Sequence, residues 1–249
     1  MSGLTDSVAI VTGAAGGLGR EIVSALCAEG VRVIAEDIAD SVAELETADG
    51  TVLALRGDVS RAETAASAVE LALERFGRLD VLVNNAGRGV FRPLLETTDE
   101  DFDELMSSNV RGVFVHSRAA LPALERAPAG AIVNVASISG LVGLPGQAVY
   151  CATKGAIVQL TRAIAVEFAA SGVRVNAVAP GAILTPLLEQ ALGGGDDLEE
   201  GLKAVAGHHP MGRYSTADEI AAVVVFLASP AASFMTGAIV AADGGYTAA

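Results

Sequence analysis

The chain has 249 residues, of which 51% are hydrophobic and 18% are charged. This composition supplies enough apolar side chains for a buried core and excludes an intrinsically disordered protein. The formal net charge of −14 argues against nucleic acid and anionic membranes as partners, because an acidic surface repels both polyanions.

An alternation of strands and helices begins at the N-terminus. The pattern predicts a buried strand at residues 8–11, a helix at about 20–29 and a second strand at 31–36. The turn between the first strand and the helix, residues 12–19, contains four glycines. Glycines at such a turn let the backbone approach a pyrophosphate, and the helix N-terminus supplies N–H donors. The spacing is not G-x-G-x-x-G, so this turn alone also fits an ordinary strand–helix connection.

Polar side chains follow the next strands. Asp37 comes directly after the second strand, where a carboxylate can accept hydrogen bonds from the adenosine ribose hydroxyls and repels a 2′-phosphate. The next residue, Ile38, is not basic, so this end of the pocket favours NAD over NADP. Asp58 and Val59 follow a third strand at 51–55. Asn84-Asn85-Ala86-Gly87 follows a fourth at 80–83, and the two amides suit either a ligand contact or a turn.

Three capping boxes are predicted to open helices: Ser60 with Glu63, Thr97 with Glu100, and Thr216 with Glu219. The helix after Thr97 has an apolar stripe from Phe102 to Phe114, which indicates a face directed at the core. Asn109 interrupts this stripe. A buried amide must find partners, so Asn109 either bends the helix, binds water or serves a site.

A strand at 132–137 ends in Ser137, thirteen residues before Tyr150. The residues after Tyr150 predict a helix, which places Tyr150 and Lys154 one turn apart on one face. A free phenol has a pKa of ~10, and a neighbouring ammonium lowers it, so Tyr150 becomes a usable proton donor or acceptor. The Ser137 hydroxyl is placed to steady a carbonyl oxygen. Tyr-x-x-x-Lys by itself is common on solvated helices, so its weight depends on the other motifs.

The C-terminal third continues the alternation around one irregular section. A sixth strand at 172–179 leads to Pro180-Gly181, and a seventh lies at 239–241. Residues 186–213, with Gly-Gly-Gly-Asp-Asp at 193–197, form either a lid over a pocket or a solvated insertion. The adjacent His208 and His209 diverge and lack further ligands at useful spacing, so no metal site is expected. His116 is expected at the surface or an interface.

These elements predict one doubly wound Rossmann α/β domain over residues 1–249, with about seven parallel strands and helices on both faces. The two cysteines, Cys27 and Cys151, fall in predicted helices and suggest no disulfide. The sequence shows neither a targeting segment nor an apolar run of bilayer length, so a cytoplasmic protein is expected.

Taken together, the motifs resemble those of the short-chain dehydrogenase/reductase family over essentially the full chain. Residues 12–19 match its Thr-Gly-x-x-x-Gly-x-Gly loop, and residues 84–87 match its Asn-Asn-Ala-Gly motif. The resemblance implies a catalytic tetrad of Asn109, Ser137, Tyr150 and Lys154. It also implies a cofactor site that comprises Gly13, Gly17, Leu18, Gly19, Asp37, Ile38, Asp58, Val59, Asn85, Ala86, Gly87, Tyr150, Lys154, Pro180, Gly181, Ile183 and Thr185.

The resemblance further implies hydride transfer between NAD(H) and a secondary alcohol or ketone, with Tyr150 as the general acid or base. Lys154 would lower the Tyr150 pKa and bind the nicotinamide ribose, Ser137 would orient the substrate oxygen, and Asn109 would hold a water molecule. Relatives pair into homotetramers or homodimers through helices that correspond to about 98–127 and 150–170.

Two other functions stay open, a 3-oxoacyl-thioester reductase and a cofactor-binding sensor that does not catalyse a reaction. A cofactor-binding sensor without turnover needs no Tyr–Lys pair, so the intact tetrad favours an enzyme. The substrate pocket is expected from residues 88–94, 139–147 and the lid, and it is mostly apolar apart from Arg88, Arg92 and Gln147. A 3-oxoacyl thioester, a cyclic or steroid-like alcohol and a sugar-derived polyol all remain candidate substrates.

Overall fold

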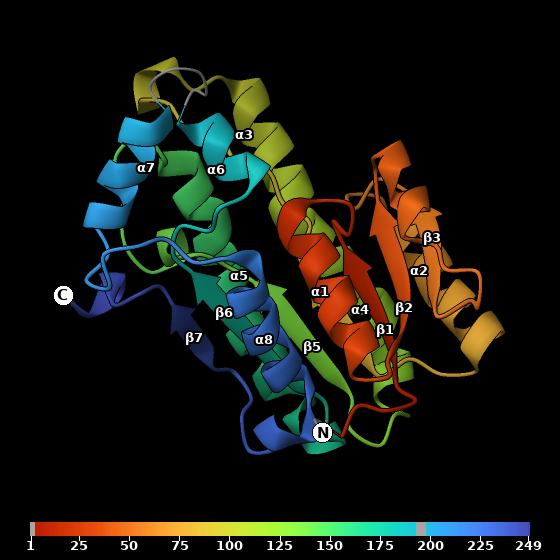
Figure 1. Cartoon of the computed structure of the whole chain (residues 1–249). Coiled ribbons are helices and arrows are strands. Elements are labelled where there is room, and N and C mark those ends of the chain that lie inside the picture. The colour runs from red at the N-terminus through yellow and green to blue at the C-terminus, as the bar shows by residue number, and fades with distance from the viewer. Residues whose placement is uncertain (1–2, 193–197) are drawn as a thin grey trace.

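The computed structural model describes residues 3–192 and 198–249, and Figure 1 shows a central sheet with helices on both faces. Seven parallel strands form the sheet in the order β3-β2-β1-β4-β5-β6-β7. The strands are β1 (Val8–Thr12), β2 (Arg32–Asp37), β3 (Val52–Arg56), β4 (Val81–Asn84), β5 (Ala131–Val135), β6 (Arg174–Pro180) and β7 (Ile239–Ala242). The predicted fold class is confirmed.

The helices differ from the predicted spans by a few residues at most of their ends. They are α1 (Gly17–Ala28), α2 (Ala62–Phe76), α3 (Asp99–Leu105), α4 (Gly112–Leu124), α5 (Ala148–Phe168), α6 (Pro186–Ala191), α7 (Leu198–Gly207) and α8 (Ala217–Ala228). A π-helical stretch, Met106–Arg111, joins α3 to α4 without a break.

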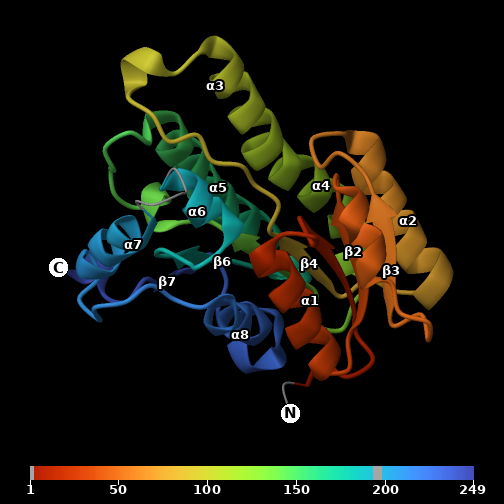
Figure 2. The ribbon, with the colours of Figure 1, turned by 45° about the horizontal axis from the view of Figure 1, so that its top comes forward.

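Two apolar layers hold the helices to the sheet. Every residue of β1, β5 and β6 is buried, as expected for parallel strands covered on both faces. Side chains of α1 and α8 pack on one face, and those of α2, α4 and α5 pack on the other. Figure 2 shows α1 and α8 together on one side of the sheet. The winding reverses between β1 and β4, so the carboxyl ends of these two strands define the crevice where such folds bind ligands.

The capping boxes were predicted with mixed success. Thr216 and Glu219 form the expected box at the start of α8. The box of α3 lies one residue later than predicted and uses Thr98 and Asp101. Helix α2 has no side-chain cap, since its N-cap residue is Arg61, and the Ser60 hydroxyl donates to the Asp58 carboxylate at 2.8 Å.

The predicted apolar stripe around Asn109 is wrong at both ends. Phe102 is 46% exposed and Phe114 is 44% exposed, whereas Leu105 and Val113 are buried. The π-helical stretch lies between the two phenylalanines, so one α-helical period cannot describe both sides of it.

His116 is not at the surface. It is 2% exposed, and its Nε2 lies 2.9 Å from a carboxylate oxygen of Glu36, which is 1% exposed. Its Nδ1 lies 3.1 Å from the Gly112 carbonyl oxygen. The pair joins α4 to β2 beneath the carboxyl edge of the sheet.

Candidate active site

The glycine turn after β1 is shaped by close backbone contacts. Gly13 has a φ of +65°, and a Cβ there would lie 2.7 Å from the Ala86 Cα. A Cβ on Gly19 would overlap the Gly13 carbonyl oxygen. Helix α1 begins with no side-chain cap and no acidic residue in its first turn. Its N–H donors and positive dipole end therefore suit a pyrophosphate, and the turn fits a dinucleotide.

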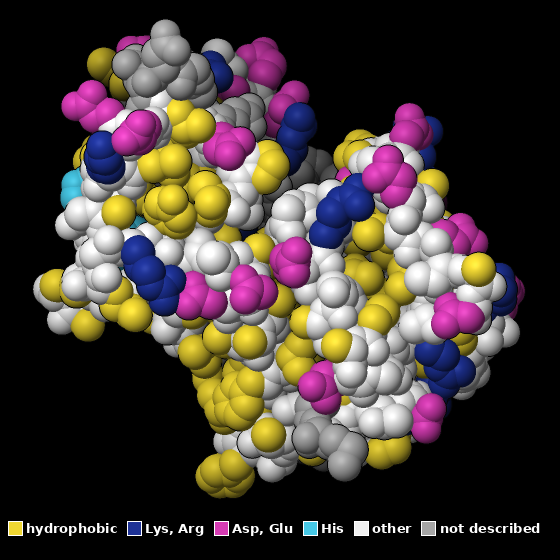
Figure 3. All heavy atoms as spheres, viewed as in Figure 1, with side chains coloured by type: hydrophobic (Ala, Val, Ile, Leu, Met, Phe, Trp, Pro, Cys, Tyr) yellow, Lys and Arg dark blue, Asp and Glu magenta, His cyan; other side chains and the backbone are white. Residues whose placement is uncertain are grey.

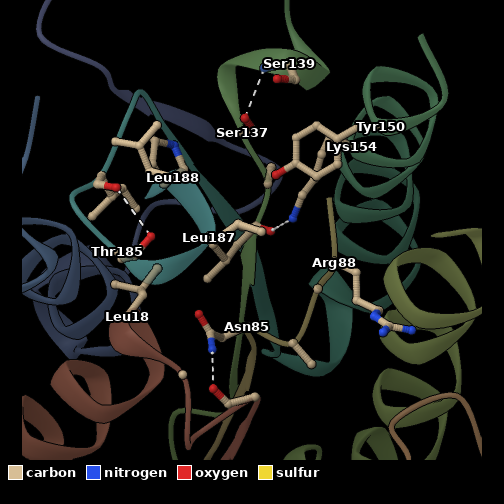
Figure 4. Close-up of a pocket in the computed structure, with 18 of the residues that line it drawn as sticks. Leu18, Asn85, Arg88, Ser137, Ser139, Tyr150, Lys154, Thr185, Leu187 and Leu188 are labelled. Carbon is tan, nitrogen blue, oxygen red and sulfur yellow. Dashed lines mark hydrogen bonds between the residues drawn. The ribbon is translucent and has the colours of Figure 1, made fainter. Parts of the chain in front are cut away.

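The Asn84–Gly87 segment supports this turn. The N–H groups of Asn85 and Ala86 each donate to the Thr12 hydroxyl at 3.1 Å. The Asn85 amide nitrogen donates to the carbonyl oxygens of Thr12 and Gly13, each at 3.0 Å (Figure 4). Asn84 turns into the core, where it donates to Asn134 at 2.8 Å. The amide nitrogens of Asn84 and Asn85 thus serve as internal supports.

Two acidic residues lie at the ends of β2 and β3. Asp37 accepts hydrogen bonds from the N–H groups of Ala15 and Ala39, at 2.9 Å and 3.0 Å. It is therefore tied to the glycine turn. Asp58 accepts from the N–H and hydroxyl of Ser60, and these hydrogen bonds hold the pKa of Asp58 below its usual value. Val59 and Ile38 follow the two carboxylates along the same wall.

Ser137, Tyr150 and Lys154 converge on one wall of the crevice (Figure 4). Ser137 follows β5 by two residues, and its hydroxyl accepts from the Ser139 N–H at 3.1 Å. Tyr150 and Lys154 lie one turn apart on α5. The Lys154 ammonium donates to the Val135 carbonyl oxygen at 2.9 Å and lies 5.6 Å from the centre of the Tyr150 ring.

The expected lowering of the Tyr150 pKa is not found in this structure. Burial raises the pKa of Tyr150 to about 12, and a hydrogen bond with Ser137 opposes this rise. Burial also lowers the pKa of Lys154 to about 8. Both shifts favour the neutral group, because burial penalises whichever form carries the charge. The Lys154 ammonium donates to Val135, and burial outweighs any effect of its charge on the Tyr150 pKa.

Asn109 lies in the π-helical stretch and is fully buried. Its amide oxygen accepts from the Arg88 N–H at 2.8 Å and from Ser108 at 3.0 Å. Its amide nitrogen donates to the Arg88 carbonyl at 2.9 Å and to Thr153 at 3.1 Å. Both N–H groups of the amide and one lone pair of its oxygen are thus used, and the Ser108 hydroxyl shares its one proton between Asn109 and the Glu104 carbonyl. The side chain of Asn109 therefore fixes the Arg88 backbone to α5. The water molecule expected on Asn109 stays a prediction.

The segment after β6 closes the crevice. Gly181, Ile183 and Thr185 all face it, and Thr185 and Pro186 also lie near the glycine turn. A Cβ on Gly17 would lie 3.3 Å from each of these two side chains. Thus α6, which begins at Pro186, starts next to the N-terminus of α1.

One cavity of about 930 Å³ unites these groups. Every cofactor residue expected from the sequence lines it, as does Ser137; Asn109 does not. Parts of all three expected substrate segments line it as well. Arg92 does not line it, and its guanidinium pairs with Asp101 at 3.2 Å. The expected glycine-rich residues 193–197 lie outside the described residues.

Sequence analysis missed some lining residues, including Glu36, Glu104, Ser107 and Tyr246. Tyr246 follows β7, and parallel strands present their carboxyl ends at one edge, so its place after the last strand was a usable signal. Within residues 3–192 and 198–249, no group of three or more His, Cys, Asp or Glu residues is placed to hold a metal ion. In the same residues, no helix is long and apolar enough to cross a membrane.

A doubly wound sheet with a dinucleotide-shaped crevice and a Ser–Tyr–Lys wall defines a nicotinamide-dependent oxidoreductase. A family model described as enoyl-(acyl carrier protein) reductase matches residues 13–247. Cyclopentanol dehydrogenase of Comamonas testosteroni is 40% identical, with 100% of both chains covered. The chain belongs to the short-chain dehydrogenase/reductase family.

Two solved structures support this assignment. A crystal structure of levodione reductase has a TM-score of 0.92 and 39% identity, covering 98% of this chain and 99% of that one. ElxO with NADP bound has a TM-score of 0.89 and 31% identity, covering 98% and 99%. The chain is thus an enzyme that interconverts a secondary alcohol and a ketone with a nicotinamide cofactor.

Proposed function

We propose that the chain is an NAD(H)-dependent dehydrogenase in which Tyr150 is the general acid and base. The observation that carries this proposal is the convergence of Ser137, Tyr150 and Lys154 on the cavity that the glycine turn also lines. The cofactor supplies or accepts the hydride when bound. Tyr150 donates a proton to the ketone oxygen during reduction and accepts it during oxidation. Ser137 orients the same oxygen.

The preference for NAD rests on charge at the end of β2. Asp37 and Ile38 line this end of the cavity, and the only arginine or lysine side chains among the described lining residues are Arg88 and Lys154. A 2′-phosphate beside the Asp37 carboxylate is repelled, and no lining arginine or lysine at the Asp37 end compensates.

The substrate half of the cavity favours a neutral, largely apolar alcohol or ketone. Its apolar lining comes from Phe91, Leu144, Leu187, Leu188 and Val205, and Ser139 and Gln147 add polar groups. Arg88 is paired with Glu104 at 3.2 Å, which leaves little positive charge for a phosphate or carboxylate. The names of two relatives, cyclopentanol dehydrogenase and levodione reductase, agree with a small ring substrate.

The section over the cavity is proposed to act as a lid. Helices α6 and α7 contribute Leu187, Leu188 and Val205 to the lining. Hydrophobic side chains also gather on the surface over α6 and α7 (Figure 3). We propose that α6 and α7 belong to the same single catalytic domain as the sheet. A cytoplasmic location stays an expectation from the sequence.

A homotetramer is proposed on the faces left apolar by the single chain. Phe102 on α3, Phe114 on α4 and Val166 on α5 are 46%, 44% and 82% exposed. These helices are the ones through which family members are expected to pair.

The test is a panel of neutral secondary alcohols and ketones, each assayed with NAD(H) and NADP(H) by nicotinamide absorbance. Small cyclic substrates with NAD(H) should give the highest kcat/KM. An acyl thioester preferred over every neutral ketone would contradict the substrate proposal. NADP(H) preferred over NAD(H) would contradict the role of Asp37, and binding of cofactor without turnover of any substrate would favour the sensor.

A further inference from the structure

His209 is buried at the end of the lid and uses both ring nitrogens. It follows α7 by two residues and is 5% exposed. Its Nδ1 lies 2.8 Å from the Val205 carbonyl oxygen. Its Nε2 accepts a hydrogen bond from the Ala182 N–H at 3.2 Å.

These two contacts determine the protonation state of the ring. A carbonyl oxygen can only accept, so Nδ1 must carry a proton. An amide N–H can only donate, so Nε2 must be unprotonated. Both bonds exist only in the neutral imidazole with its proton on Nδ1. A second proton on Nε2 would face the Ala182 N–H and break that link.

The link joins the lid to the segment that follows β6. A Cβ on Gly181 would lie 2.6 Å from His209 Nε2, so the ring packs directly on this backbone. The backbone of Ser215 holds the other side of the segment, with its N–H donating to the Ala182 carbonyl at 2.9 Å. Tyr246 covers the ring with its centroid 5.3 Å away. His209 therefore stands between α7 and the segment that contributes Gly181, Ile183 and Thr185 to the cavity.

We propose that His209 is a positioning residue that holds the 181–185 segment in place to receive the nicotinamide half of the cofactor, and that it does so only as the neutral tautomer. This inference rests on the proposed cofactor role of the segment. His209 acts through Ala182 and needs no contact with the cofactor itself.

The ionisable groups around the ring come from several elements. Asp243 and Tyr246 follow β7, and Asp243 accepts hydrogen bonds from Gly245 and Thr247. A second cavity of about 340 Å³ on the other side of His209 is lined by Arg213 and Glu219, which pair with each other at 2.7 Å. His208 precedes His209 in the chain. Tyr150 and Lys154 line the main cavity, as do both histidines.

The test compares two substitutions. A glutamine can donate to Val205 from its amide nitrogen and accept from Ala182 on its amide oxygen, but it does not titrate. His209→Gln should therefore keep the link at every pH, whereas His209→Leu removes it. The probes are NAD and ADP-ribose, which lacks only the nicotinamide ring, and the readout is Kd from calorimetry with the full-length protein.

At pH 8, His209→Leu should weaken NAD binding roughly tenfold, the effect of one lost hydrogen bond that leaves a donor unpaired. ADP-ribose should bind both variants and the wild type within about twofold. On acidification below pH 8 the wild type should lose affinity for NAD relative to ADP-ribose more than His209→Gln does, because only the wild-type ring can accept a second proton on Nε2 and lose the Ala182 hydrogen bond.

Equal weakening of both probes in His209→Leu would show a general structural role and overturn the inference. So would a pH dependence of the NAD to ADP-ribose ratio that is the same in His209→Gln and wild type. Wild-type protein that binds neither probe would instead contradict the proposed cofactor site. A KM for NAD that rises in His209→Leu while kcat changes less would support positioning.

Discussion

Replacement of His116 is expected to leave the buried Glu36 carboxylate without its ion-pair partner. Its ring and the Glu36 side chain are each 1% exposed, and Nε2 and the carboxylate lie 2.9 Å apart. Nδ1 must carry a proton in order to donate to the Gly112 carbonyl, and a second proton must lie between Nε2 and Glu36. The pair is therefore either an imidazolium with a carboxylate or a neutral imidazole with a carboxylic acid. The second carboxylate oxygen of Glu36 has no hydrogen-bond partner among the described residues.

The magnitude follows from this geometry. At 2.9 Å two unit charges attract by about 6 kcal/mol at an effective dielectric constant of about 20. Most of this attraction offsets the free-energy cost of burying both charges. When one partner is lost, the cost of burying the remaining charge is no longer offset. His116→Leu should therefore lower the free energy of unfolding by about 3–5 kcal/mol. The double variant Glu36→Leu, His116→Leu should lie within about 1 kcal/mol of wild type, because no charge is then buried.

The assay is urea unfolding at pH 7.5 followed by far-ultraviolet circular dichroism, with all variants at one protein concentration. Glu36→Leu completes the double-mutant cycle. A loss below about 1 kcal/mol for His116→Leu would refute the reasoning. A double variant as unstable as the sum of the single ones would refute it too, since the two side chains would then act independently.

Three further predictions concern the catalytic wall and the cofactor. Tyr150→Phe should lower kcat by ~10²-fold or more with little change in NAD affinity, since only the proton donor is lost. Tyr214→Phe, which lies outside the main cavity, is the control. Near-normal turnover of Tyr150→Phe would contradict the catalytic role of Tyr150. Asp37→Arg should shift the ratio of kcat/KM for NAD and NADP by on the order of tenfold or more toward NADP, and an unchanged ratio would show that this carboxylate does not choose the cofactor. Oxidation of an alcohol needs the phenolate, so its rate should rise with pH. Burial raises the Tyr150 pKa to about 12 even with the opposing hydrogen bond to Ser137, so a plateau well below that pH requires a nearby positive charge. Lys154→Met should then move the rising limb to higher pH, and a limb that stays in place in saturating NAD would mean that Lys154 does not tune Tyr150.

The sheet and most of the cavity were predictable because they depend on local patterns. Buried strands give unbroken apolar runs, and the carboxyl ends of parallel strands meet at one edge. Residues next to those ends, such as Gly13, Asp37 and Asn85, therefore lie together in the cavity. The family resemblance placed the residues that lie farther along the chain.

What was not predictable depends on partners far apart in the sequence. His116 was expected outside because a histidine on a helix gives no sign of a carboxylate 80 positions away. The pKa of Tyr150 was expected to fall because spacing shows that Lys154 is near but not that its ammonium points to Val135. Asn109 was left with three possible roles, and only the geometry shows that Arg88 and Thr153 accept both hydrogen bonds of its amide nitrogen.

The π-helical stretch between α3 and α4 constrains the length of this part of the chain. The π-helical stretch inserts about one residue relative to an unbroken α-helix, and this rotates α4 by about 100° about the helix axis. In this register Val113 and Ala120 face the sheet and Asn109 faces Arg88. Deletion of any single residue in Met106–Arg111 would favour a straight helix and turn either the apolar face of α4 or the amide of Asn109 away from its partners. Substitutions here are thus easier to accommodate than changes in length, and the loop that carries Gly87 and Arg88 depends on that count.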